Sequence, residues 1–152
     1  MKTVIIPADF TADSLQVAHV LARNAQQKFS IVFTHLFHVA DDIQDLLFST
    51  YRKKEYDFVS EDFWKECHVI KDVYSNKVHS IKVEFFYGNK LAAFKNFLDA
   101  NNADFIAFSE SNGIPKLSKS SLDALPIIKK AGVELINVDK IEEPANTQEI
   151  CF

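Results

Sequence analysis

Glycine is scarce in this sequence, which holds only three glycines in 152 residues. Loops that bind phosphate through backbone amides depend on glycine, because a Cβ atom keeps the phosphate away from the amides. Neither the Walker loop nor the GxGxxG loop of dinucleotide-binding proteins occurs. These two glycine-rich nucleotide motifs are therefore excluded.

Cysteine and positive charge are also in short supply. The two cysteines, Cys67 and Cys151, belong to no CxxC pair and are too few for a disulfide framework, so we expect a cytoplasmic protein. The net charge is −4 and the pI is near 5.7, whereas nucleic-acid binding needs a concentrated basic face. The uncharged run at residues 3–7 is too short for a signal peptide or a membrane span. We therefore expect no nucleic acid and no membrane as a partner.

What the sequence has in quantity is apolar and aromatic residues, including 14 phenylalanines, which predict one domain with a ring-rich core. Short β-branched runs alternate with stretches whose apolar residues recur every three or four positions. This alternation is typical of a parallel sheet with helices on both faces. We predict an α/β, Rossmann-like fold with a five-stranded parallel sheet, whose strands lie at 2–7, 30–39, 79–88, 103–109 and 132–138.

The connection between the second and third strands is much longer than the others. It predicts two helical segments, one at about 43–51 and one that begins near Ser60. Their aromatic stripes favour core packing, and a lid over the strand ends is the alternative. We assign residues 1–139 to one domain with a helical insertion at about 41–79, and residues 140–152 to a C-terminal extension.

Parallel sheets bind ligands outside the carboxyl ends of their strands, where the strand order reverses. The segments that follow the first, second and fourth strands should meet there. Asp9 is the most informative residue among them, because a carboxylate at the end of a buried strand needs hydrogen-bond donors. Either the base or ribose of a ligand or the amides at the start of the first helix can supply these donors. Thr11 can cap that helix, which would leave Asp9 free for a ligand.

Four segments match those of a known family in order, spacing and junction residues. They read VIIPADFTADSLQVAHVLA, THLFHV, VEFFYGNKLAAFKNFLDANNADFIAFS and VELINV. On these segments the chain resembles the universal stress protein family over nearly its whole length. The resemblance implies a five-stranded sheet of the adenine nucleotide alpha hydrolase-like type and a homodimer paired through the last strand, here residues 133–138. It also implies ATP binding in many members, which use an aspartate after the first strand, matched here by Asp9.

The ATP-binding members carry G-x2-G-x9-G-[S/T] in the loop after the fourth strand, and this chain departs from that pattern. With Asn112 at the second glycine, the first falls on Ser109 and the last pair on residues 122–123. With Gly113 there, the first falls on Glu110 and the last pair on residues 123–124. Neither register recovers more than one glycine, and the side chains present narrow the approach of a phosphate.

The helix after this loop adds a second objection to ATP binding. Pro126 is best tolerated in the first turn of a helix, which places the N-cap near residues 121–123. A carboxylate there, Asp123, satisfies the helix amides and repels a polyphosphate by about 1 kcal/mol at ~4 Å in water. Against this, Ser120, Ser121 and two nearby lysines could bind a single phosphate. A solvated polar loop is the interpretation that we favour.

The sequence contains no evident catalytic or metal-binding set. His35 and His38 lie three positions apart on a strand, so their side chains point to opposite faces and cannot hold one metal together. His38 and the aspartates after it could form a metal cluster, but a hydrogen-bonded histidine is the simpler interpretation. Cys67 and His68 diverge by about 100° on a helix and make a poor nucleophile–base pair.

We therefore predict a dimeric regulatory or stress-associated module that is not an enzyme and does not bind ATP in the usual way of the family. The alternatives are an adenine-nucleotide protein that binds AMP or ATP through Asp9 and the loop at 109–121, and a weak nucleotide hydrolase. The sequence identifies no protein partner and no cofactor beyond these candidates. Any ligand would contact Pro7, Ala8, Asp9, Val39, Phe108, Ser109, Asn112, Gly113, Ser120 and Ser121.

Overall fold

A computed structural model describes residues 1–37, 59–88, 90–111, 113–114, 121 and 123–141. Within these residues, five parallel strands form one sheet in the order β3-β2-β1-β4-β5. The predicted five-stranded parallel sheet is therefore confirmed. The strands are β1 Lys2–Pro7, β2 Phe29–Phe37, β3 Val78–Tyr87, β4 Phe105–Phe108 and β5 Glu134–Asn137.

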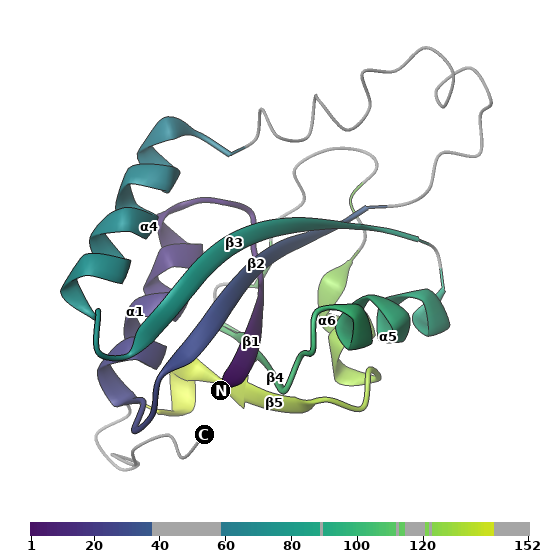
Figure 1. The fold of residues 1–152 in the computed structure, drawn as a ribbon. Coiled ribbons are helices and arrows are strands. Elements are labelled where there is room, and N and C mark those ends of the chain that lie inside the picture. Colours follow the sequence, from purple (N-terminus) through teal and green to yellow (C-terminus); the bar gives the residue numbers. More distant parts are fainter. Residues whose placement is uncertain (38–58, 89, 112, 115–120, 122, 142–152) are drawn as a thin grey trace.

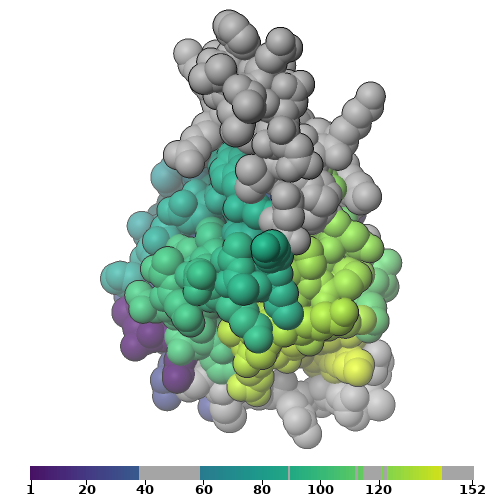
Figure 2. All heavy atoms as spheres, turned by 90° about the vertical axis from the view of Figure 1, so that its right-hand side faces the viewer, coloured from purple at the N-terminus to yellow at the C-terminus, as the bar shows by residue number. Residues whose placement is uncertain are grey.

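Helices cover both faces of the sheet, as the sequence predicts (Figure 1). The helices α1 Ala12–Asn24 and α4 Glu61–Val73 lie on one face, where the 3-10 helix η1 Val138–Lys140 also packs. The helices α5 Leu91–Ala100 and α6 Ala124–Lys129 lie on the other face. Figure 2 looks onto this second face, with α5 in teal-green beside α6 in yellow-green. No helix in the described part of the chain is both long and apolar enough to cross a membrane.

Successive residues of β1 face the two helical layers in turn. Val4 and Ile6 pack with α1 and α4, whereas Ile5 packs with α5 and α6. All three side chains are fully buried. This burial on both faces explains why the strand is a continuous apolar run rather than an alternation of apolar and polar residues.

Phenylalanine rings fill both cores, as their number in the sequence predicts. Phe33 and Phe94 are fully buried on opposite faces of the sheet. Phe33 meets Phe63 of α4 edge to face with 5.1 Å between the ring centroids, and Phe94 meets Phe86 of β3 in the same way at 5.2 Å. Each such pair stabilises the fold by about 0.5–1.5 kcal/mol beyond the burial of its surface.

Helix α4 is the second of the two helices predicted in the long connection. Ser60 is its N-cap, and the Ser60 hydroxyl oxygen accepts a hydrogen bond from the amide of Phe63 at 3.1 Å. Phe63, Cys67 and Ile70 are buried, so this helix packs into the core rather than serving as a lid. The first predicted segment, 43–51, lies outside the described residues, as do residues 142–152 of the predicted extension.

The strand order reverses at β1. The sheet extends through β2 and β3 on one side of β1 and through β4 and β5 on the other. The reversal therefore falls between β1 and β4, and the carboxyl ends of these strands are where a parallel sheet binds ligands. The edges of the sheet are β3 and β5.

Candidate functional site

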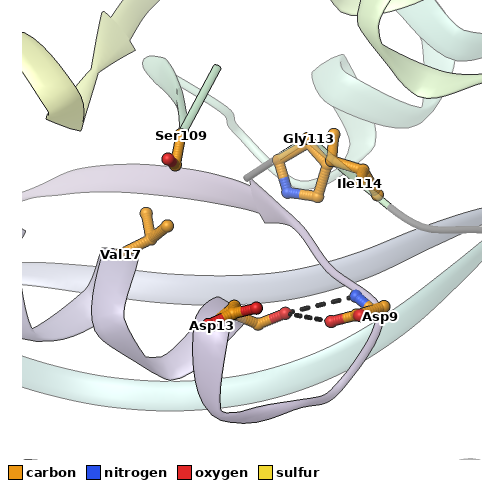
Figure 3. A pocket seen from close by; sticks show the side chains of 8 residues that line it. Asp9, Asp13, Val17, Ser109, Gly113 and Ile114 are labelled. Atoms are coloured by element: carbon orange, nitrogen blue, oxygen red, sulfur yellow. Dashed lines mark hydrogen bonds between the residues drawn. The ribbon is translucent and has the colours of Figure 1, made fainter. Parts of the chain in front are cut away.

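A small pocket lies at the point where the strand order reverses, between the start of α1 and the loop that follows β4 (Figure 3). Asp9, Asp13 and Val17 lie on the α1 side, and Ser109 lies opposite them. The pocket is lined by Pro7, Asp9, Asp13, Ser14, Val17, Ser109, Gly113 and Ile114.

The size and charge of this pocket limit what it can bind. Its accessible volume is about 20 Å³, which is room for about one water molecule. Pockets for small molecules usually measure about 300–1,000 Å³. Of the eight lining residues that the structure describes, Asp9 and Asp13 are acidic and none is basic. Among the described lining residues, the pocket therefore offers little free space and carries acidic side chains.

The carboxylate of Asp9 is held by residues of its own loop. Its Oδ1 accepts hydrogen bonds from the hydroxyls of Thr11 at 2.6 Å and Ser14 at 2.8 Å, and from the amide of Thr11 at 3.2 Å. The Ser14 hydroxyl oxygen also accepts from the amide of Asp9 at 3.2 Å, as the dashed lines in Figure 3 show. Of the two sources of donors that the sequence left open, the start of α1 therefore supplies those on Oδ1.

The predicted role of Thr11 is wrong in one respect. Thr11 occupies the N-cap position of α1, but its side chain makes no capping hydrogen bond. The Thr11 hydroxyl donates to Asp9 Oδ1, and a hydrogen bond to a carboxylate is roughly twice as strong as one between neutral groups. Asp9 is therefore engaged by the helix start and is not left free.

Phe10, between Asp9 and Thr11, has φ = 61°, a left-handed conformation that bulky residues rarely adopt. Its ring is buried and packs edge to face against Phe63 at 5.5 Å and against Phe85 at 5.7 Å between ring centroids. Such a backbone costs about 1–3 kcal/mol, which this packing offsets. Aromatic packing thus holds the turn that carries Asp9.

The loop after β4 is held by a carboxylate from η1, which directly follows β5. The Ser109 hydroxyl donates to Asp139 Oδ1 at 2.6 Å, and the amide of Ser111 donates to Asp139 Oδ2 at 2.8 Å. Burial would raise the pKa of Asp139, but hydrogen bonds from Ser109, from Ser111 and from the amide of Glu110 hold the pKa below its ordinary value. At neutral pH an anion of the chain itself therefore occupies this loop.

The far end of the same loop is attached to β2. Ser121 Oγ lies 2.8 Å from Nε2 of His35, and both side chains are 2% exposed. The carbonyl of Ala8 accepts a hydrogen bond from His35 Nδ1, so Nε2 of the neutral ring accepts from the Ser121 hydroxyl. Burial lowers the pKa of His35, against the opposing effects of the Ala8 hydrogen bond and the charge of Asp9. A backbone bridge between Phe37 and Ser121 strengthens the attachment.

This pair has the connectivity of a serine nucleophile and a histidine base. Neither side chain is accessible, so no substrate can reach the pair in this arrangement. Ser121 and His35 instead fasten the loop to the sheet. The Ser121 hydroxyl, which the sequence suggested as an anion ligand, is consequently bound to His35.

The structure brings together some of the predicted ligand contacts. Pro7, Asp9, Ser109 and Gly113 line the pocket. Three other predicted residues do not line it and are buried, namely Ala8 and Phe108 in the two cores and Ser121 against His35. The remaining predicted residues, Val39, Asn112 and Ser120, lie outside the described residues.

The sequence prediction lacks two residues that organise the site, Asp139 and His35. The rule that ligand-binding residues follow strand ends also applies to the fifth strand, and there it would have indicated Asp139. No sequence pattern links His35 to Ser121, because the two residues are 86 positions apart. Asp13, Ser14 and Val17 line the pocket because they lie in the first turns of α1.

The start of α6 agrees with the prediction in position but not in its capping. Asp123 is the N-cap, within the predicted range 121–123, and Pro126 lies in the first turn. The Asp123 side chain makes no capping hydrogen bond. Its carboxylate therefore does not satisfy the helix amides as the sequence suggested.

Other candidate chemistry finds no support in the described residues. Cys67 is 4% exposed, and burial, with a smaller effect from the charge of Glu66, raises the pKa of its thiol to about 12, so the thiol is inert. Among the described residues, no group of three histidine, cysteine or acidic side chains could hold a metal ion. His38, the other candidate, lies outside them.

Comparison with known proteins identifies the fold. No protein-family model matches the chain, and no curated protein matches it. Among solved structures, universal stress protein UspA from Lactobacillus plantarum is similar at a TM-score of 0.57 and 10% identity, over 90% of this chain and 96% of that chain. A universal stress protein family member from Burkholderia pseudomallei is similar at a TM-score of 0.52 and 8% identity, over 90% and 94%. This chain therefore has the universal stress protein fold, which confirms the fold that the resemblance implies.

Proposed function

We propose that this chain is a regulatory, stress-associated module that has the universal stress protein fold and does not bind ATP in the usual way of that family. The fold supports the class of protein, and the site supports the second part of the proposal. We also propose that the chain acts by binding to other proteins rather than as an enzyme, since the Ser121–His35 pair is buried.

The observation that carries the proposal is the state of the pocket where the strand order reverses. It offers about 20 Å³, it carries the carboxylates of Asp9 and Asp13, and its Ser109 hydroxyl is bound to Asp139. A phosphate placed ~4 Å from one carboxylate would be repelled by about 1 kcal/mol in water and about 4 kcal/mol near a protein surface. Among the lining residues that the structure describes, none is a lysine or arginine that would offset this repulsion.

Calorimetric titration with ATP, and separately with AMP, in the presence of Mg²⁺ tests the proposal. We expect no saturable heat and no thermal stabilisation. A ligand present at 100 times its dissociation constant would add about 2.7 kcal/mol to the free energy of unfolding, which a melting curve detects easily. Stoichiometric ATP binding would overturn the proposal. Binding lost in Asp9→Ala would favour the adenine-nucleotide alternative, and Mg²⁺-dependent phosphate release lost in the same variant would favour the hydrolase.

We propose further that two copies pair through β5, in residues 133–138. β5 is an edge of the sheet, and Leu135 and Ile136 on it are only partly buried within one chain. Native mass spectrometry of Ile136→Lys tests this pairing, with Ile81→Lys on the opposite edge β3 as the matched control. We expect a dimer that only the β5 variant dissociates. A monomeric wild type, or equal dissociation in both variants, would overturn the pairing.

A further inference from the structure

The turn that follows β4 presents several hydrogen-bond donors to one point. The hydroxyls of Ser109 and Ser111 and the amides of Glu110 and Ser111 all contribute hydrogen bonds that stabilise the ionised Asp139. Successive backbone amides that point into one concave turn form a nest, which is a general anion-binding arrangement. A further backbone hydrogen bond, from the amide of Gly113 to the carbonyl of Ser109 at 3.0 Å, closes the turn.

The neighbouring strand delivers Asp139 to this turn. Phe108 at the end of β4 pairs with Asn137 at the end of β5, so the residues just after both strands lie side by side. The Asn137 side chain accepts from the amide of Asp139 at 3.2 Å and donates to Glu110 at 3.3 Å. Val138 is buried in the core beside α1. The carboxylate is therefore aimed at the turn from a fixed backbone.

The donors that hold this carboxylate are all neutral among the residues that the structure describes. No ion pair to Asp139 is recorded within the described residues, whereas Glu110 pairs with Lys129 at 3.2 Å. Neutral donors of this kind suit any compact oxyanion, because their hydrogen bonds to a charged acceptor are the stronger class. Ser109 belongs both to this turn and to the pocket, so an empty turn would open toward the pocket.

We propose that the turn at residues 109–111 is an oxyanion site and that Asp139 is an internal ligand which must leave before a carboxylate or phosphate group can bind there. This inference rests on the proposed function, since it gives the reason why the loop takes no phosphate from a nucleotide. A tethered group acts at an effective concentration in the millimolar range or above. A free anion with millimolar affinity therefore cannot displace Asp139, and the site opens only when η1, just after β5, is withdrawn.

Chemical rescue in the full chain tests this proposal. Asp139→Ala removes the internal anion and leaves the donors, so acetate or inorganic phosphate should bind in its place. We expect a saturable rise in melting temperature with either anion, measured against sodium chloride at equal ionic strength. The amide NMR signals of Glu110 and Ser111 should shift along the same saturation curve, and the wild type should show neither change. Rescue by only one of the two anions would identify which group the site takes.

Two control variants sharpen the test. Asp139→Asn fills the same space with a neutral group and should show no rescue. Asp104→Ala removes a carboxylate that accepts from the amide of Thr3 at 2.9 Å and lies 4.0 Å from Lys2, outside any nest. It should lose stability without saturable rescue.

A folded Asp139→Ala that shows no saturable shift at Glu110 or Ser111 would overturn the proposal. If Asp139→Ala does not fold, recovery of its fold in acetate would support the proposal. In that case a folded Asp139→Ser whose Glu110 and Ser111 amide signals do not shift with either anion would refute it. ATP binding by the wild type would refute the proposed function instead, whatever the rescue shows. Failed rescue in a chain that binds no ATP would refute this inference alone.

Discussion

Asp9 and Asp139 lie on the two sides of the point where the strand order reverses, and different kinds of partner hold them. The hydrogen-bond donors to Asp9 are two and five residues further along the chain. The donors to Asp139 are 28 and 30 residues earlier, on the loop after another strand. One carboxylate thus organises a local turn, and the other joins two distant segments.

Asp9 therefore stabilises the start of a helix, whereas Asp139 holds the loop after β4 in its closed position. The hydrogen bonds of Asp9 form whenever α1 begins, so they stabilise the helix start and compete with any ligand at that point. The hydrogen bonds of Asp139 form only when β5 is paired with β4. Loss of that pairing would therefore release the loop after β4 while leaving Asp9 in place. Four experiments test this separation, beginning with the largest expected effect.

Phe10→Ala should have the largest effect, because the exit of β1 depends on packing as well as on Asp9. The substitution removes a ring that is 5% exposed and contacts Phe63 and Phe85. We expect the free energy of unfolding to fall by about 3–5 kcal/mol, measured by chemical denaturation. Phe97→Ala, at a partly buried ring on the other face, should cost less. An equal or smaller loss in Phe10→Ala would show that this turn does not depend on its ring.

Asp9→Ala should lower the free energy of unfolding by about 1–2 kcal/mol, since helix starts lose roughly this much when the acceptor for their donors is removed. Hydrogen exchange should become faster in the first turn of α1 and stay unchanged at residues 109–111. Asp9→Asn keeps an acceptor oxygen and should lose much less. Faster exchange at both places would contradict the separation of the two sides.

Combining Asp9→Ala with Asp139→Ala should give additive losses within about 0.5 kcal/mol, because the two carboxylates share no hydrogen-bond partner among the described residues. The measurement is a double-mutant cycle by chemical denaturation. A larger coupling energy would mean that the two sides communicate through the pocket between them.

Much of the fold can be predicted from the sequence, because it depends on local periodicity. The apolar run at β1 and the capped pattern that begins at Ser60 each determine their element within a few residues. The strand–helix alternation indicates a parallel sheet but not the order of its strands, which the structure supplies. Asp9, which the sequence singled out, lines the pocket, but that a ligand binds there stays a prediction.

The state of the site is harder to predict, because it depends on contacts between distant residues. Ser109 and Ser121 read as free hydroxyls in a polar loop, but Asp139 and His35 engage them. The conformation of Phe10 cannot be predicted from the sequence either. A positive φ is usual for glycine, and at Phe10 it is imposed by tertiary packing. Tertiary contacts thus decide whether a predicted ligand residue is available.

The smallest effect that we expect is on the pH dependence of stability. His35 and Asp139 should affect stability in different pH ranges. Burial lowers the pKa of His35, whose Nδ1 donates to Ala8 beside Asp9. The unfolded chain therefore binds this proton more readily than the folded one, so stability is lost as the pH falls below about 6.5. The hydrogen bonds that hold the pKa of Asp139 low act in a different window, because their contribution is lost only below about pH 4.

Denaturation of His35→Gln and Asp139→Asn across this pH range distinguishes the two windows. His35→Gln should flatten the change near pH 6, and Asp139→Asn should flatten the change below pH 4. Burial also lowers the pKa of His19, with a further effect from Arg23, so His19→Gln is the control for the upper window. If His35→Gln left the upper window unchanged while His19→Gln removed it, His35 of β2 would not be the titrating group. Only the two carboxylates, Asp9 and Asp139, would then distinguish the two sides.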